Sequence, residues 1–173
     1  MAGDSGRSLT RIEVTDLLRL AGLADKAEAE LFARRPEVAR RYAGRLLCRA
    51  LCQGAALYYL SAEKGIKDFD VWSFYAGHDD GPFPYRWHLQ RDFGPSKFGR
   101  YPGDPPSYAG RRVDFLGRSL PAGLRTDPAV ALRRYLSAGR TATARALAAK
   151  AVILIDPKHR VGEIVWPDPG YMR

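Results

Sequence analysis

Short runs of β-forming residues alternate along this chain with segments of helical pattern, and this alternation limits the possible folds more than any other feature. The clearest run, residues 68–75, holds four aromatic side chains and one valine, and these residue types favour strands. Residues 46–52 form a second compact apolar run, which fits a strand and fits a helix nearly as well. We predict further strands at 112–116 and 152–155, with 161–166 returning as a hairpin partner of 152–155.

Helix-start signals and apolar spacing predict helices before and between these strands. Near the N-terminus we expect two short helices, one capped by Thr15-Asp16 and one starting at Asp25. Pro36 is expected to be a boundary or the first residue of a third helix. Residues 55–60, directly after the run at 46–52, predict another short helix.

The C-terminal third carries equally clear helix signals. Asp127 followed by Pro128 is typical of an N-cap and a first helical residue, and Gly139 is placed to end that helix. Thr141 can cap a second helix that reaches Lys150. These patterns together predict the α/β (α+β) class, with a mixed β-sheet flanked by N-terminal and C-terminal helices.

The 173 residues suit one domain with a proper core. We interpret residues 1–45 as an N-terminal helical segment and residues 46–173 as the main domain, the two forming one compact unit. Residues 77–110 hold most of the turn-forming glycines and prolines and predict a Pro/Gly-rich insertion, part of which, at 85–93, can pair as strands. A connection this long is unusual in a compact domain and is often functional.

Lys and Arg outnumber Asp and Glu by 28 to 19, a formal net charge of +9. Such an excess attracts polyanions such as RNA or nucleotides, although an arginine-rich protein without such a partner has the same composition. The first residues lack the apolar segment of a secretory signal, and no run approaches the roughly 20 apolar residues of a membrane span. We therefore expect a cytoplasmic protein without membrane association, and the sequence carries no signal for its oligomeric state.

The two cysteines, Cys48 and Cys52, lie four residues apart within the apolar run and have no second cysteine pair. We interpret them as buried free thiols rather than as a disulfide or a zinc site. The three histidines, His78, His88 and His159, show no ligand spacing, which also argues against zinc.

Two carboxylates share one face of the clearest predicted strand. Residues i and i+2 of a strand point the same way, so Asp68 and Asp70 stand side by side while Phe69 and Val71 point into the core. Adjacent carboxylates repel each other and are costly to bury unpaired. Mg²⁺ or Mn²⁺ removes that cost, because hard ions take carboxylate oxygens. Asp114 is a third acid between apolar neighbours on a short strand, and three such acids can hold two metal ions.

A glycine turn precedes the acidic strand. Gly54 and Ala55 lie between the candidate strand at 46–52 and the helix that follows it. Glycine permits close approach of the backbone, and a helix N-terminus offers free N–H groups to phosphate. We also expect Lys67 and Arg112, which neighbour the acids in the sequence, to bind nucleotide.

The order strand, Gly-containing turn, short helix, Asp-x-Asp strand and later third acid, over roughly residues 46–118, resembles the nucleotidyltransferase superfamily of polymerase-β type. The resemblance implies a mixed sheet flanked by helices. It places Gly54 and Ala55 in the triphosphate loop and implies that three acids bind the metals, Asp114 also helping to activate the acceptor: Asp68, Asp70 and Asp114. Residues 52–59 and 65–72 also resemble uncharacterised bacterial nucleotidyltransferase-like proteins.

This resemblance implies a Mg²⁺- or Mn²⁺-dependent enzyme that moves an NMP group from an NTP substrate to an unidentified acceptor. Ala55 departs from the Ser or second Gly usual in the family, which favours an alternative: a catalytically inactive nucleotidyltransferase-like protein that binds nucleic acid or a protein partner. A metal-dependent nuclease ranks last, because no acid-x-Lys motif lies beside the acidic pair. A further alternative is that the acids are exposed carboxylates that protect an edge strand from aggregation.

Basic and aromatic residues surround the acids in the sequence. In the insertion they suit phosphate binding and base stacking, or equally a loop whose aromatic residues pack underneath: Phe83, Tyr85, Arg86, Trp87, Arg91, Phe93, Lys97, Phe98, Arg100, Tyr101, Tyr108, Arg111 and Arg112. Asp92, within the same segment, is a further candidate for the site. The C-terminal helices carry six cations against a single acid, Asp127, and these suit contact with RNA or, more ordinarily, a solvated face: Arg125, Arg133, Arg134, Arg140, Arg145 and Lys150.

Overall fold

The computed structural model describes residues 6–84 and 89–168, and it confirms the α+β class with a mixed six-stranded sheet flanked by helices. The elements follow in the order α1 (Val14–Arg34), α2 (Pro36–Tyr42), β1 (Leu46–Cys52), α3 (Gln53–Ser61), β2 (Phe69–Ala76), β3 (Leu89–Asp92), β4 (Arg112–Leu120), α4 (Pro128–Ala138), α5 (Ala142–Ala148), β5 (Val152–Asp156), the 3₁₀ turn η1 (Lys158–Arg160) and β6 (Ile164–Trp166).

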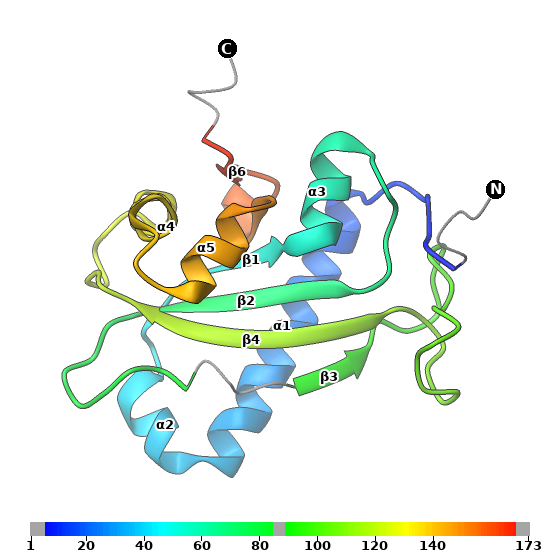
Figure 1. The fold of residues 1–173 in the computed structure, drawn as a ribbon. Helices are drawn as coiled ribbons and strands as arrows, with labels where there is room; N and C mark the ends of the chain where they lie inside the picture. The colour runs from blue at the N-terminus through cyan, green and yellow to red at the C-terminus, as the bar shows by residue number, and fades with distance from the viewer. Residues whose placement is uncertain (1–5, 85–88, 169–173) are drawn as a thin grey trace.

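The strands lie in the order β3-β4-β2-β1-β5-β6 (Figure 1). Only β2 and β4 pair in parallel among the described strands, with Asp70 opposite Asp114. Parallel neighbours cannot be joined by a tight hairpin, because the chain must return along the whole strand before it pairs again. The Pro/Gly-rich residues 77–110 provide this return and include the edge strand β3, which explains the length of the segment.

Helices cover both faces of the sheet. In Figure 1, α1 crosses behind β2 and β4, whereas α4 and α5 lie in front of the sheet. Strand alternation supplies a core to each layer: Phe69 and Val71 are fully buried on the side of α1 and α3, as predicted, and Trp72 and Phe74 pack against α4 and α5. None of the helices among the described residues combines the length and hydropathy that crossing a membrane requires.

The N-terminal helices differ from the prediction in one respect. Residues 14–34 form a single 21-residue helix rather than two short ones, and Glu13 rather than Thr15 is its N-cap. The predicted start at Asp25 was wrong because the buried residues continue through it at helical spacing, among them Leu20, Ala24 and Ala27. The expected third helix is confirmed as α2.

A buried arginine attaches α1 to the sheet. The side chain of Arg49, on β1, is only 2% exposed, yet its guanidinium donates hydrogen bonds to Asp25 and Glu28 of α1 and to Ser73 of β2. The hydroxyl of Tyr75 donates to the same Glu28 carboxylate. Buried charge is tolerated only when it is paired in this way. Asp25 therefore serves within α1 as a partner of the buried Arg49.

The remaining predicted elements are confirmed with changed ends. Residues 46–52 are a strand, the strand from residue 112 extends to Leu120, and the last helix ends at Ala148 instead of Lys150. In the predicted strand region at 85–93 only β3 is seen, and residues 85–88 lie outside the described residues. Both cysteines are buried and free.

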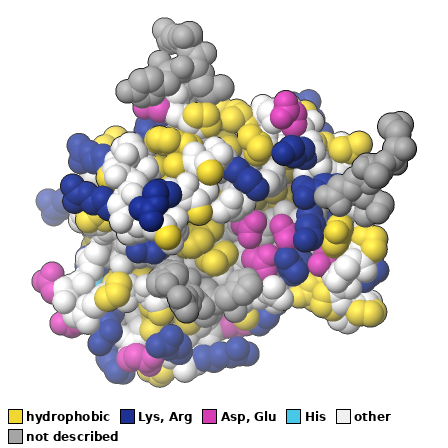
Figure 2. Space-filling model, in the orientation of Figure 1, with side chains coloured by type: hydrophobic (Ala, Val, Ile, Leu, Met, Phe, Trp, Pro, Cys, Tyr) yellow, Lys and Arg dark blue, Asp and Glu magenta, His cyan; other side chains and the backbone are white. Residues whose placement is uncertain are grey.

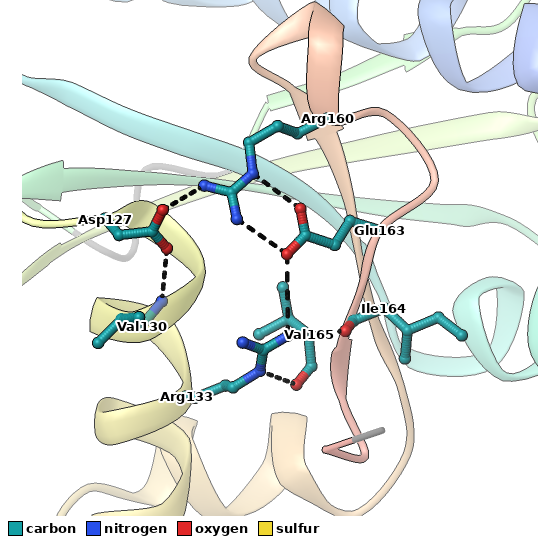
Figure 3. A network of polar contacts seen from close by, with 7 residues as sticks. All are labelled: Asp127, Val130, Arg133, Arg160, Glu163, Ile164 and Val165. Atoms are coloured by element: carbon teal, nitrogen blue, oxygen red, sulfur yellow. Dashed lines mark hydrogen bonds and ion pairs between the residues drawn. The ribbon is translucent and has the colours of Figure 1, made fainter. Parts of the chain in front are cut away.

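An ion-pair network fastens the β5–β6 hairpin to α4 (Figure 3). The Arg160 guanidinium contacts both carboxylate oxygens of Glu163, at 2.7 and 2.9 Å, and one oxygen of Asp127, at 2.6 Å. The other Asp127 oxygen accepts a hydrogen bond from the Val130 amide and so caps α4, as the sequence predicts. Arg133 donates to the backbone carbonyls of the hairpin strand β6.

Two substitutions of Asp127 separate its role as the N-cap of α4 from its ion pair with Arg160. Asp127→Ala removes both the cap and the contact with Arg160, and we expect it to lower the free energy of unfolding by about 1–2 kcal/mol. Asp127→Asn keeps a good capping side chain, so it should cost less than half as much. Chemical denaturation of the two variants measures the difference, and equal losses would contradict a capping role.

Candidate functional site

Three acids converge at the end of the sheet where β2 and β4 begin. One carboxylate oxygen from each of Asp68, Asp70 and Asp114 lies within 4.8 Å of the other two. The parallel register places Asp70 beside Asp114, and Asp68 directly precedes β2. Figure 2 shows acidic side chains gathered on this part of the face, with Lys and Arg side chains beside them. The structure therefore brings the three predicted metal ligands together.

Asp70 is the acid under the greatest electrostatic strain. Burial raises its pKa to about 7, with a further contribution from the neighbouring charges of Asp68 and Asp114, whereas Arg112 and Lys150 act in the opposite direction. No hydrogen bond or ion pair to its carboxylate is found within residues 6–84 and 89–168. A cation bound next to Asp70 would relieve this cost.

Arg112 contacts the cluster directly. Its guanidinium lies 2.7 Å from Asp68, 3.2 Å from Asp114 and 3.8 Å from Asp104. The sequence predicted that Arg112 binds nucleotide; in the structure it bridges carboxylates and does not line the adjacent cavity. One guanidinium therefore contacts three carboxylates.

Asp104 is a fourth acid that the sequence analysis missed. Its side chain is 3% exposed, and one of its carboxylate oxygens is buried without a hydrogen-bond partner among the described residues. It lies between a glycine and a proline within the 77–110 connection, so no strand pattern marks it. The return of the chain to β4 brings it to Arg112.

A cavity of about 350 Å³ opens beside the acids. At its edge the β1–α3 turn places Gln53 at φ 60°, and a Cβ added to the next residue, Gly54, would meet no atom within 4 Å. The space above this turn is therefore open to a ligand. The cavity is lined by Arg7, Gln53, Gly54, Ala55, Gly65, Lys67, Asp68, Asp70 and Lys150.

The lining combines carboxylates with cations, which is the combination that a metal-bound phosphate requires. Gly54, Ala55 and Lys67 were predicted as nucleotide-binding residues, and all three lie on this cavity. Lys67 also lies over the ring of Tyr101, 5.3 Å from its centroid. Arg7 and Lys150 were missed as site residues, because both are distant from the acidic motif in the sequence and carry no motif of their own.

The aromatic residues of the 77–110 connection serve mainly as core. Phe83, Phe93 and Phe98 are buried, and the rings of Phe93 and Phe98 pack against Phe69 at 5.2 and 5.4 Å. For these three residues the packing interpretation holds and base stacking is excluded. Asp92, a further candidate for the site, instead accepts hydrogen bonds from three backbone amides of the same connection.

Comparison of this chain with models of protein families, with curated proteins and with solved structures found no match. The site is therefore interpreted from its own geometry and chemistry.

The raised pKa of Asp70 predicts a pH-dependent stability. Its ordinary value is 3.8, so between about pH 4 and 7 the native state keeps a proton that the unfolded chain releases, and the native state loses stability as pH rises. Asp70→Asn should remove this loss and be more stable than the parent at pH 8, by on the order of 2 kcal/mol or roughly 5 °C in Tm. Thermal unfolding at pH 4.5 and pH 8 measures the effect.

The control for this experiment is Asp79→Asn, which removes the same charge from an exposed position. Its Tm should follow that of the parent at both pH values. A Tm difference between Asp70→Asn and the parent that does not change with pH would contradict the assignment.

Arg112→Met should destabilise the metal-free protein by about 2 kcal/mol, because it removes a cation that contacts three carboxylates. Added Mn²⁺ should restore much of that loss, so the variant should gain more from Mn²⁺ than the parent does. Arg91→Met, which breaks the partly exposed pair with Glu30, should cost less than about 1 kcal/mol and be insensitive to Mn²⁺. Equal Mn²⁺ responses in all three proteins would exclude a cation site here.

Proposed function

We propose that this chain is a metal-dependent nucleotidyltransferase, which transfers an NMP group from an NTP to an acceptor hydroxyl. The observation that carries the proposal is the convergence of Asp68, Asp70 and Asp114 beside a cavity bordered by a glycine turn and two lysines. The order of elements that resembles the nucleotidyltransferase superfamily, from β1 to β4, supports the same conclusion.

The donor set fits Mg²⁺ or Mn²⁺. All the candidate ligands are carboxylate oxygens, which hard divalent ions prefer. Asp70 has a pKa raised to about 7, and Asp104 holds an oxygen without a partner in the described structure, so the cluster has negative charge in excess of Arg112. Asp68, Asp70 and Asp114 would hold the ion, which supplies charge neutralisation for the triphosphate and the departing pyrophosphate.

The other residues of the cavity bind and orient the nucleotide. Lys67 and Lys150 provide positive charge for the phosphates. Gly54 and Ala55, at the start of α3, line the same cavity, and the free amides of a helix N-terminus suit phosphate oxygens. Asp114 orients the attacking hydroxyl of the acceptor. Phosphoryl-type transfer requires mainly positioning and charge neutralisation, and these groups are of the types that the reaction needs.

A second candidate function is a nucleotidyltransferase-like protein that binds nucleic acid or a protein partner without transfer. Two observations favour it: Arg112 already forms ion pairs with two of the three acids, and Ala55 offers no hydroxyl to a phosphate. The two candidates differ in what the acids must do, since only transfer requires them to bind a metal.

Label transfer from each α-³²P-labelled NTP to total RNA, with Mg²⁺ or Mn²⁺, tests the proposal. We expect transfer with at least one NTP, and a loss of 100-fold or more in Asp68→Asn and in Asp70→Asn, because each variant removes a metal ligand. Asp79→Asn, an exposed acid outside the site, should keep full activity.

Two other outcomes would contradict the proposed transfer. Salt-sensitive RNA binding that is unchanged in Asp70→Asn, without label transfer from any NTP, would support the binding protein. Shortened RNA without label would indicate a nuclease instead.

A further inference from the structure

A second cavity, of about 470 Å³, lies on the same face of the sheet as the acids but at the opposite end of β4. From Asp114 to Arg118 the strand advances by about 13 Å, so the two sites are separate. The cavity is enclosed by the end of β4, by α4 and by the turn before α5.

The charge of this cavity is of one sign. Among the described residues, three arginines line it, Arg118, Arg134 and Arg140, and no acid does. The side chains of Arg134 and Arg140 make no hydrogen bond or ion pair within the described part of the chain. Figure 2 shows dark blue side chains over α4 and α5, well apart from the acidic cluster. Arg134 and Arg140 therefore offer positive charge that no described residue pairs with.

Neighbouring arginines on the same two helices behave differently. Arg133 donates to backbone carbonyls of β6, and Arg145 donates to the carbonyl of Gly139. These two arginines have structural partners, whereas the Arg134 and Arg140 guanidinium groups have none in the described structure and remain available to a ligand in the cavity.

Arg118 is held in place at the inner wall. It donates a hydrogen bond of 3.0 Å to the Thr143 hydroxyl, and its guanidinium lies 5.7 Å from the centroid of the Tyr135 ring. A fixed guanidinium can bind an oxyanion with little loss of side-chain freedom. It therefore gives the cavity a preorganised anion-binding group beside the two free arginines.

The rest of the lining is largely carbon. Pro121, Ala122, Ala131 and Ala138 contribute small apolar surfaces that leave room for a flat or compact group. A volume of about 470 Å³ falls within the range typical of small-molecule sites. The cavity thus combines an apolar floor with a cluster of cations.

We propose that this cavity binds a small organic phosphate, with the phosphate held by Arg118, Arg134 and Arg140 and an apolar or aromatic body on the alanine-lined floor. The three arginines provide several N–H donors to one oxyanion, which favours phosphate over a singly charged group. The proposal does not depend on the acids, and it stands whether or not the chain transfers nucleotides.

Isothermal titration calorimetry with 1-naphthyl phosphate, 1-naphthol and inorganic phosphate tests the two parts of the proposal. We expect 1-naphthyl phosphate to bind at least tenfold more tightly than either of the other probes, because only it contacts both the arginines and the apolar floor. Comparable binding of 1-naphthol, or no binding of 1-naphthyl phosphate at millimolar concentration, would overturn the proposal.

Variants locate the binding. Arg134→Gln/Arg140→Gln should weaken 1-naphthyl phosphate binding at least tenfold, and since both side chains are exposed, the Tm should stay near that of the parent. Arg40→Gln/Arg125→Gln removes the same charge from exposed positions outside the cavity and should leave the affinity unchanged. Equal losses in the two double variants would show a general charge effect and overturn the assignment.

Asp70→Asn separates this site from the candidate metal site. It should bind 1-naphthyl phosphate as the parent does, even if it has lost all label transfer. A tenfold loss of affinity in Asp70→Asn would place the organic phosphate at the acids and overturn the proposal.

Discussion

The parallel pairing of β2 with β4 is the constraint on which the candidate site depends. It sets Asp70 directly opposite Asp114, and strand alternation then sends Phe69, Val71 and their β4 counterparts to the core on the other face. The same pairing requires a connection that returns along the sheet, and residues 77–110 provide it. That connection also brings Asp104 to Arg112. The long loop and the acidic cluster are thus consequences of one topological choice.

Arg49 and Arg112, two of the arginines that pair with carboxylates, illustrate opposite electrostatic situations. Arg49 is matched by Asp25 and Glu28 and donates a further hydrogen bond to Ser73, while the Tyr75 hydroxyl donates to Glu28, so its cluster is closed and structural. Arg112 faces Asp68, Asp104 and Asp114, while Asp70 lies beside them without a partner in the described structure. Burying a charge without a counter-ion costs free energy. An added cation should therefore stabilise the acids around Arg112 more than those around Arg49.

Local sequence patterns predicted most of the elements and the three converging acids, because the alternation of apolar residues in residues 68–75 and the position of Asp114 between apolar neighbours are local signals. The contribution of Asp104 was not predictable, because it depends on how a connection without regular structure folds back. The single helix α1 was missed for a related reason: Asp25 resembles a helix start until its partner, the buried Arg49, is known. Arg49 itself was hidden within an apolar run. Long-range ion pairs thus decided the features that local patterns left open.

Anomalous diffraction from crystals soaked in Mn²⁺ tests the central claim most directly. The account predicts an anomalous peak within coordination distance, about 2.0–2.3 Å, of carboxylate oxygens of Asp68, Asp70 and Asp114, with the Arg112 guanidinium displaced from at least one of them. Crystals that show no peak at these acids at pH 8 and millimolar Mn²⁺, with Arg112 still bridging Asp68 and Asp114, would contradict it. The cluster would then be a structural ion-pair network and not a metal centre.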